Sequence, residues 1–79
     1  MAFLMNGDKF VVKLPRNETI WSLKVAISGL VGINPKEQIL VFLGRKLKND
    51  RTLLHYRIDS DSLLSLQLQP LETYILEEK

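Results

Sequence analysis

Residues 19–32 carry a helical pattern that constrains how the rest of the chain can fold. Thr19 can cap the first free backbone amides of a helix, and Gly32 can adopt the left-handed conformation that ends one. Between them, apolar side chains recur at helical spacing: Ile20, Leu23, Ile27 and Leu30. A helix of about twelve residues is marginal in water unless its apolar stripe is buried. We therefore predict one long helix packed against the short apolar segments on either side of it.

The segment before this helix predicts a β-hairpin. Asn6-Gly7 lies between two short apolar runs, and both residues tolerate the positive φ that a tight hairpin turn requires. A turn of two residues and a turn of four give the same strand parity. The face predicted to enter the core is therefore the same in both cases: Phe3, Met5, Phe10, Val12 and Leu14.

Three segments after the helix are predicted to complete a sheet. Residues 38–42 form a strand, and residues 45–47 return as a short strand after Gly44. In the last segment apolar and polar side chains alternate, which predicts a half-buried strand through Leu64, Leu66 and Leu68. Residues 52–58 are apolar but irregular, so no element is assigned to them. The order of strands and helix implies an α+β fold, a mixed sheet covered on one face by one helix.

Composition limits the kinds of function. The 79 residues contain no cysteine and one histidine, His55, so we expect no disulfide, no thiolate nucleophile and no metal site. A net charge of +2 is too small to indicate a nucleic-acid partner, and no apolar run approaches the roughly 20 residues that span a bilayer. So small a domain has little room for a ligand pocket of roughly 300 Å³ or more. We expect a monomer without cofactor, small-molecule ligand or membrane contact.

No residue pattern predicts catalysis. His55 has no cysteine to activate, and serine or aspartate neighbours in the sequence do not make a triad. The carboxylates on turns and in the tail are interpreted as solvent-facing charges: Asp59, Asp61, Glu77 and Glu78. We therefore predict that the chain is not an enzyme. The absence of a signal-peptide pattern leads us to expect a cytoplasmic or nuclear location.

From about residue 14 to residue 68, the sequence resembles ubiquitin and ubiquitin-like domains without a gap. The segments that carry the resemblance are Thr19-Ile20, Leu23-Lys24-Val25-Ala26-Ile27, Gly32-Ile33-Asn34-Pro35, residues 38–47, Arg51-Thr52-Leu53, Tyr56 and Ile58. The resemblance implies a β-grasp domain of four to five strands on one helix over residues 1–70, with residues 71–79 as a tail or the start of a linker or helix. It also implies that Lys24 packs partly under the helix and that the Tyr56 hydroxyl bonds back to residues 48–50.

The resemblance also bears on function. Ubiquitin is joined to lysines through a C-terminal glycine pair, whereas residues 69–79 contain no glycine. This implies a non-conjugated ubiquitin-like domain that acts as a protein-protein interaction or regulatory module within a larger protein of the ubiquitin system. Two alternatives stay open. One is a conjugatable modifier whose glycine tail is missing from this chain, and the other is a structural domain that packs on its parent protein.

The resemblance places a docking surface on the outer face of the sheet, where the matching positions are Val41, Ser65 and Gln67. Only the first is apolar, so we expect weak or absent binding to ordinary ubiquitin receptors. A differently shaped apolar patch is predicted instead, formed by Ile39, Val41 and Leu43. The basic residues that follow it are either solvated surface or a site that steers an acidic partner: Arg45, Lys46, Lys48 and Arg51.

Trp21 and Val25 form a second candidate surface. They lie four residues apart, on the helix face opposite the core stripe. In one interpretation Trp21 folds over a nearby loop or the tail, since single exposed aromatic residues are common. In the other it anchors a protein partner or another part of the parent protein, because tryptophan is enriched among interface hot spots.

Overall fold

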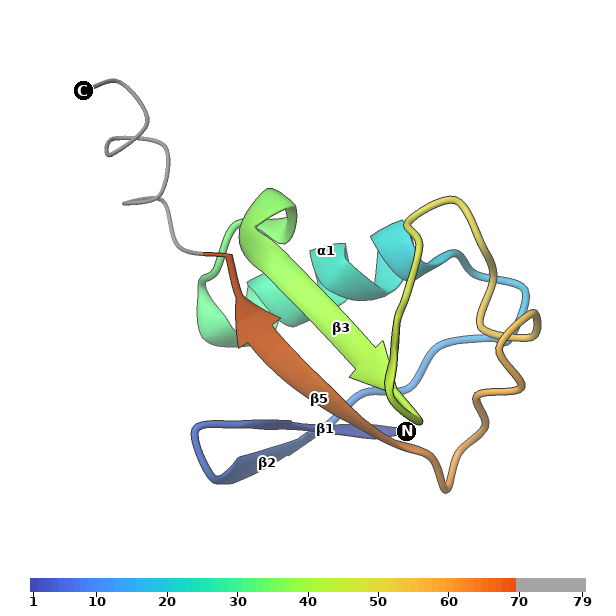
Figure 1. Cartoon of the computed structure of the whole chain (residues 1–79), viewed down its shortest axis with the longest axis horizontal. Coiled ribbons are helices and arrows are strands. Elements are labelled where there is room, and N and C mark those ends of the chain that lie inside the picture. The colour runs from blue at the N-terminus through green and yellow to red at the C-terminus, as the bar shows by residue number, and fades with distance from the viewer. Residues whose placement is uncertain (70–79) are drawn as a thin grey trace.

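The computed structural model describes residues 1–69 of the chain. Within these residues the elements are β1 (Ala2–Met5), β2 (Asp8–Val11), α1 (Ile20–Val31), the short 3₁₀ helix η1 (Pro35–Glu37), β3 (Gln38–Phe42), β4 (Arg45–Lys46) and β5 (Leu63–Leu68). Figure 1 labels α1 and the strands β1, β2, β3 and β5. The predicted tail, residues 71–79, lies outside the described residues.

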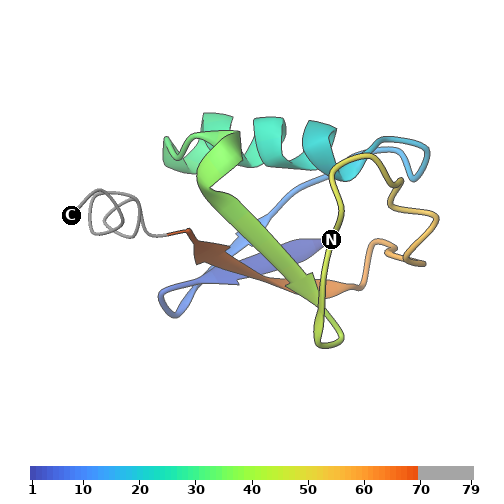
Figure 2. The same cartoon turned by 45° about the horizontal axis from the view of Figure 1, so that its top comes forward.

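The five strands form one mixed sheet in the order β2-β1-β5-β3-β4. β1 and β5 are parallel, and the other neighbouring pairs are antiparallel. Helix α1 lies across one face of the sheet, and the described residues place no helix on the other face (Figure 1, Figure 2). The predicted fold class, a mixed sheet covered on one face by one helix, is confirmed.

Helix α1 begins and ends where the sequence predicts. The Thr19 hydroxyl accepts a hydrogen bond from the Ser22 backbone amide at 3.1 Å, which satisfies one of the free donors of the first turn. Gly32 follows the helix with a φ of 73°, and its N–H donates to the Ser28 carbonyl. The core side of α1 is closed by three side chains that are at most 1% exposed: Ile20, Leu23 and Ile27.

The prediction that Leu30 belongs to the core stripe is wrong. Its side chain is 55% exposed, whereas Val31 is half-buried against the core. Seen from Ile27, residue 30 is rotated by about 60° to one side and residue 31 by only about 40° to the other, because a helix turns about 100° per residue. The buried Lys24 lies on the same side as Val31. The helix therefore faces the sheet with this side and turns Leu30 to solvent.

The first hairpin uses the tighter of the two predicted turns. Met5 pairs with Asp8, so the loop is Asn6-Gly7, and both loop residues have positive φ. The alternation predicted for this hairpin is confirmed. Phe3 is buried and its ring stacks on Phe10 at a centroid distance of 5.1 Å. The remaining core-facing members are buried or packed against the core: Met5, Val12 and Leu14.

Strand β5 supplies Leu64 and Leu66 to the core, but the prediction for Leu68 is wrong, because that side chain is 49% exposed. The pairing of the sheet explains the difference. β1 pairs with β5 only as far as Ser65, whereas β3 continues along β5 to its end. Leu68 therefore has a paired strand on one side only and stays open to solvent on the other.

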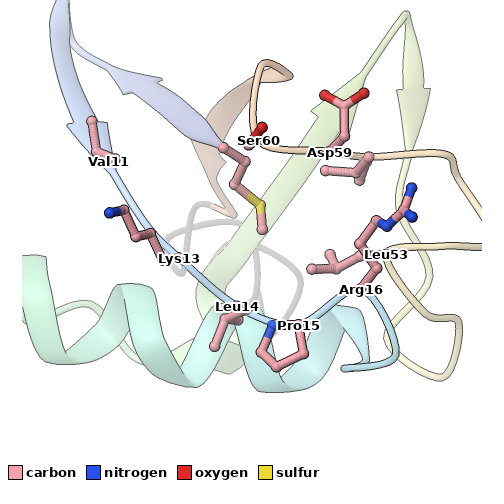
Figure 3. A pocket seen from close by; sticks show the side chains of 10 residues that line it. Val11, Lys13, Leu14, Pro15, Arg16, Leu53, Asp59 and Ser60 are labelled. Carbon is pink, nitrogen blue, oxygen red and sulfur yellow. The ribbon is translucent and has the colours of Figure 1, made fainter.

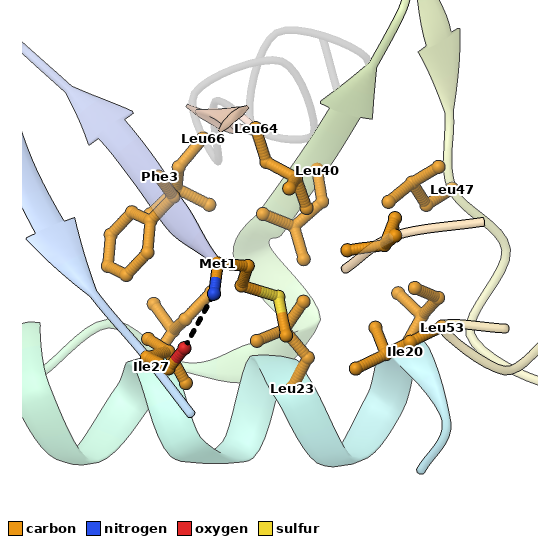
Figure 4. Packing of buried hydrophobic residues seen from close by; sticks show 12 residues of the cluster. Met1, Phe3, Ile20, Leu23, Ile27, Leu40, Leu47, Leu53, Leu64 and Leu66 are labelled. Carbon is orange, nitrogen blue, oxygen red and sulfur yellow. Dashed lines mark hydrogen bonds between the residues drawn. The ribbon is translucent and has the colours of Figure 1, made fainter. Parts of the chain in front are cut away.

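The core lies between α1 and the sheet, as Figure 4 shows. Its members at most 1% exposed come from every layer: Phe3, Ile20, Leu23, Ile27, Leu40, Leu53, Ile58 and Leu64. Met1 closes one end of this cluster, and its amino group donates a hydrogen bond to the Val12 carbonyl at 3.1 Å. Leu53 and Ile58 come from residues 52–58, so burial holds that irregular segment to the domain. Backbone hydrogen bonds add to this hold, because the amides of Leu53 and Leu54 donate to carbonyls in residues 16–18 at 2.9 Å each.

The loop after β4 binds the start of α1. The free amides of Ile20 and Trp21 donate to the carbonyls of Arg51 and Asn49 at 2.8 and 3.1 Å. The Tyr56 hydroxyl accepts a hydrogen bond from the Lys48 amide at 2.9 Å, which confirms the contact implied by the resemblance. These bonds fix the loop against the helix N-terminus and the turn that follows it.

Lys24 is 7% exposed on the sheet side of α1, so its predicted position under the helix is confirmed. No ion pair to it occurs within residues 1–69. Burial disfavours the charged form of the amine and holds the pKa of Lys24 below its ordinary value of 10.5. The alkyl stem fills space in the core while the amine carries a cost in stability.

Replacing this lysine with an apolar side chain of similar length tests that cost. Lys24→Met is expected to raise the free energy of unfolding by about 0.5 kcal/mol at pH 7, because it keeps the packing and removes a poorly solvated charge. The unfolded chain binds the lysine proton more tightly, so wild-type stability rises as pH increases through the folded pKa towards 10.5. The free energy of unfolding of Lys24→Met should not show this increase with pH. Chemical denaturation at several pH values, with the exposed Lys36→Met as control, measures both effects, and equal curves for the two variants would contradict the assignment.

Candidate interaction surfaces

Ile39 and Val41 share the sheet face opposite α1. Along β3 their neighbours Gln38 and Leu40 are buried beneath the helix, whereas Ile39 and Val41 are half-buried on the other side. Side chains alternate between the two faces of a strand, so this placement follows directly from the pattern. The structure thus presents two members of the predicted apolar patch side by side on the outer face.

A row of side chains crosses the outer face through Val41. The strand register aligns residues from all five strands in the order Lys9, Leu4, Ser65, Val41 and Lys46. Residues opposite each other in a ladder lie on the same face and in contact range. The row therefore has apolar side chains on both sides of a central serine and a lysine at each edge of the sheet.

Sequence reasoning missed the half of the outer face that β1 and β2 form. Leu4 is half-buried there, and beside it Val11 and Leu63 are 64% and 49% exposed. Ala2 lies between these two in the register. The signal was present in the sequence, because the parity that sends Phe3 inward forces its strand neighbours outward. The apolar outer face is thus wider than the predicted patch.

Leu43 occupies an unusual position for its side chain. Phe42 pairs with Arg45, so Leu43-Gly44 is a two-residue hairpin loop with φ values of 53° and 80°. Asn6-Gly7 has nearly the same values, 52° and 85°, in the other hairpin. Both are turns in which each loop residue has positive φ, and asparagine is the usual residue at the first position. The second hairpin builds the same turn with a leucine.

The backbone strain at Leu43 lowers the stability of the domain. A left-handed backbone is unfavourable for most L-residues by about 1–2 kcal/mol. The Leu43 side chain is 84% exposed, so packing within residues 1–69 does not offset that cost. In Figure 2 the turn that carries it projects from the sheet on the side away from α1. Strain held at an exposed apolar residue is a feature of binding sites.

The predicted basic cluster divides between the two faces of the sheet. Lys46 pairs with Val41 and therefore lies on the outer face, whereas Arg45 pairs with Phe42 and belongs to the other side. Both side chains are exposed. Of these two residues, only Lys46 lies beside Val41 on the outer face.

The other two basic residues lie on the loop after β4. Lys48 donates its backbone amide to Tyr56, and Arg51 stands beside the N-terminus of α1, where its carbonyl accepts from Ile20. The Arg51 side chain is 4.0 Å from the Asp50 carboxylate, and because both groups are exposed this ion pair contributes little. The predicted cluster is thus spread over several directions.

Trp21 and Val25 lie on the outer side of α1, 38% and 50% exposed. The helix and the sheet separate them from Val41, so a single flat partner cannot contact both surfaces. Trp21 is partly covered, and its backbone N–H is held by the Asn49 carbonyl. The role of this pair in partner binding stays a prediction.

A groove of about 460 Å³ opens between residues 11–16 and residues 58–60, as Figure 3 shows. The prediction that so small a domain has little room for a pocket of this size is therefore wrong. Met1 and Leu53 are among the apolar side chains that line it, and Asp59 lies at its rim. The Asp59 carboxylate accepts hydrogen bonds from the Asp61 amide at 2.9 Å and the Ser62 hydroxyl at 3.2 Å. These bonds hold the pKa of Asp59 below its ordinary value and use the carboxylate to close a turn.

Within residues 1–69, no three histidine, aspartate or glutamate side chains gather as a metal site would require. None of the helices in these residues has the length and apolar character to cross a membrane.

Comparison with known proteins decides the family. The model of the Ubiquitin family matches residues 2–71. The chain belongs to the ubiquitin family. Its helix and mixed sheet are accordingly the ubiquitin-like β-grasp fold, and its five strands agree with the four to five that were predicted.

Named relatives of this ubiquitin-like domain come from animals and plants. Ubiquitin-like protein 4A of Homo sapiens is 31% identical over 74 residues, which are 94% of this chain and 47% of that protein. The Mus musculus protein of the same name is 30% identical over the same extent. Ubiquitin domain-containing protein DSK2b of Arabidopsis thaliana is 34% identical over 61 residues, 77% of this chain and 11% of that protein. The chain spans about half the length of the first of these relatives.

On the outer face of this ubiquitin-like domain, two polar side chains lie among the apolar ones. Ser65 pairs with Val41, and Gln67 pairs with Ile39, and both polar residues are exposed. The predicted positions of these four residues on one face are therefore confirmed. Their role in partner binding stays a prediction.

Proposed function

We propose that this ubiquitin-like domain is a non-conjugated protein-interaction module that binds its partner through the outer face of the sheet. The binding surface is the β3 patch, defined as Ile39, Val41 and Leu43. The observation that carries the proposal is the strained and exposed Leu43 at the edge of the patch. The left-handed backbone at Leu43 lowers the stability of the domain, and an apolar contact with a partner would offset that loss in the complex.

The proposed partner presents apolar side chains bordered by acidic ones. Lys46 lies next to Val41 at one edge of the outer face, and Lys9 lies at the other edge. Two lysines flanking an apolar surface favour a partner whose carboxylates surround its apolar anchors. Complementary charge of this kind speeds association and weakens with added salt. An acidic rim is therefore part of the proposal.

The setting of the module is also proposed. The relatives named above are longer than this chain, which supports a domain within a larger protein. We propose that this larger protein belongs to the ubiquitin system and acts in the cytoplasm or nucleus. The absence of glycine in residues 69–79 supports the non-conjugated form. A full-length gene that continues past Lys79 to a glycine pair would favour the conjugatable modifier instead.

Exchanging the turn residues separates binding from folding. Leu43→Asn is expected to raise the free energy of unfolding by about 0.5–1 kcal/mol, because asparagine tolerates the left-handed backbone. The same change is expected to reduce partner capture from cell lysate about fivefold, because it removes an apolar anchor. Val41→Ala should reduce capture of the same proteins by a similar factor. Quantitative mass spectrometry of the captured proteins and thermal unfolding of each variant measure the two effects.

The other hairpin supplies the matched control. Asn6→Leu makes the reverse exchange in the same type of turn, so it should lower stability and leave capture unchanged. Equal capture by wild type, Leu43→Asn and Val41→Ala would contradict the β3 patch. Loss of capture with Trp21→Ala alone, at unchanged stability, would move the interface to the outer side of α1.

A further inference from the structure

We propose that an open pocket beside the β3–β4 turn binds a carboxylate of an acidic peptide segment in the partner, an inference that rests on the proposed function. The pocket has a volume of about 340 Å³. Its lining comes from the end of β3, the start of β4 and the turn after Leu54: Phe42, Leu43, Arg45, His55, Tyr56 and Arg57. Two half-buried aromatic rings and two exposed guanidinium groups thus surround one opening.

The charges in this lining are all of one sign. Arg45 and Arg57 are exposed, and neither forms an ion pair within residues 1–69. By contrast, the groove of Figure 3 contains Asp59 together with its basic residues. A guanidinium group presents paired donors that match the two oxygens of a carboxylate. Charge complementarity therefore favours an acidic group as the occupant.

Arg57 occupies a backbone position that favours glycine. The Ile58 amide donates to the Leu53 carbonyl at 3.0 Å, and the Arg57 amide donates to the Leu54 carbonyl at 2.9 Å. This pair of bonds ends a helical turn, and in such an ending the residue before the last donor, here Arg57, adopts the left-handed conformation. Arg57 has a φ of 59° there. As with Leu43, an exposed side chain is held at a strained backbone position.

The aromatic part of the pocket is fixed by contacts within the domain. The rings of His55 and Tyr56 meet edge to face at 4.9 Å and 87°. Tyr56 is held by the Lys48 amide, and the backbone N–H of His55 donates to the Thr52 hydroxyl at 3.1 Å. The aromatic part of the pocket therefore needs little ordering on binding, which reduces its share of the entropy cost of association.

Leu43 belongs to both the β3 patch and this pocket. In an extended peptide, side chains two residues apart face the same side and are about 6.6 Å apart along the chain. A partner segment with an apolar side chain over Leu43 therefore brings the side chain two positions away towards Arg45 and Arg57. The expected motif is an apolar residue with glutamate or aspartate two positions away.

Titration of the labelled domain with short peptides tests the assignment. The probe is acetyl-Leu-Glu-Glu-Leu-amide, and its neutral match is acetyl-Leu-Gln-Gln-Leu-amide. The glutamate peptide is expected to shift the backbone amide resonances of residues 43–45 and 55–57, and the glutamine peptide to bind at least fivefold more weakly. Inorganic phosphate serves as a third probe. Equal binding of both peptides, or tighter binding of phosphate than of the glutamate peptide, would overturn the proposal.

Variants separate loss of the site from loss of the fold. Arg57→Asn is expected to weaken binding of the glutamate peptide about fivefold while leaving the melting temperature unchanged or higher, because asparagine tolerates this backbone. Arg16→Asn, in the groove of Figure 3, is the matched control and should bind like the wild type. Wild-type affinity in Arg57→Asn would exclude the pocket.

The same variants distinguish this inference from the proposed function. If Leu43→Asn and Val41→Ala reduce partner capture and Arg57→Asn does not, the β3 patch stands and the pocket is wrong. If peptide binding depends on Arg57 while none of these changes affects partner capture, the proposed function is wrong and the pocket binds acidic segments independently of it.

Discussion

Ile27→Ala is expected to lower the free energy of unfolding by about 3 kcal/mol, whereas Leu30→Ala is expected to change it by less than about 0.5 kcal/mol. The two residues are three apart on the same helix. Ile27 is completely buried against the sheet, and Leu30 is 55% exposed. Truncating a buried side chain leaves a cavity that the surrounding residues fill only in part, whereas truncating an exposed side chain leaves no cavity.

Urea denaturation of both variants beside the wild type measures this difference. Alanine has the highest helix propensity, so the two substitutions have similar local effects on α1 and their difference reports packing. Similar losses in both variants would show that Leu30 packs in the core, as its spacing in the sequence predicted.

The contrast between Ile27 and Leu30 shows what apolar residues at helical spacing can predict. This spacing predicted the position of α1, and the capping residues Thr19 and Gly32 predicted its ends. Whether Leu30 or Val31 completes the stripe depends on the rotation of the helix over the sheet, which tertiary packing decides. Leu68 fails for a related reason, because its burial depends on how far β1 runs along β5. Alternation within one strand does not contain that information.

The candidate site divides in the same way. The faces of Ile39 and Val41 follow from alternation, and the sequence predicts both. The separation of Arg45 from Lys46 depends on the register of the β3–β4 hairpin, so residues that are neighbours in the sequence face different surfaces. The pocket lies between residues 42–45 and residues 55–57. Because the irregular pattern of residues 52–58 predicted no helix or strand, the sequence did not show that these two segments lie side by side. The strain at Leu43 follows from its φ of 53°, which the sequence does not predict for a leucine.

Gln38→Glu is expected to lower the free energy of unfolding by more than about 3 kcal/mol at pH 7. Gln38 is 2% exposed, and its side-chain amide donates to the carbonyls of Lys24 and Ile33 at 3.0 Å each. One side chain thus joins α1 and the segment after it to the start of β3. An ionised carboxylate has no proton to donate, and it brings a negative charge against two carbonyl oxygens.

The loss should depend on pH in a defined direction. Burial and the two carbonyls favour the protonated form of the introduced carboxyl, so its folded pKa lies above the unfolded value of about 4.3. Below the unfolded pKa the protonated group donates one hydrogen bond and part of the stability returns. That stability is lost as pH rises through the folded pKa. Gln38→Met removes the donors without adding a titratable group, so its deficit should stay constant relative to the wild type.

Denaturation of both variants and the wild type between pH 4 and pH 8 therefore separates the lost hydrogen bonds from the buried charge. Gln67→Glu provides the control, because Gln67 is exposed on the outer face and the same exchange there should change stability by less than about 0.5 kcal/mol. If Gln38→Glu and Gln38→Met show the same deficit at every pH, the introduced carboxyl is not buried against the two carbonyls. Water would then reach the introduced carboxylate between α1 and β3.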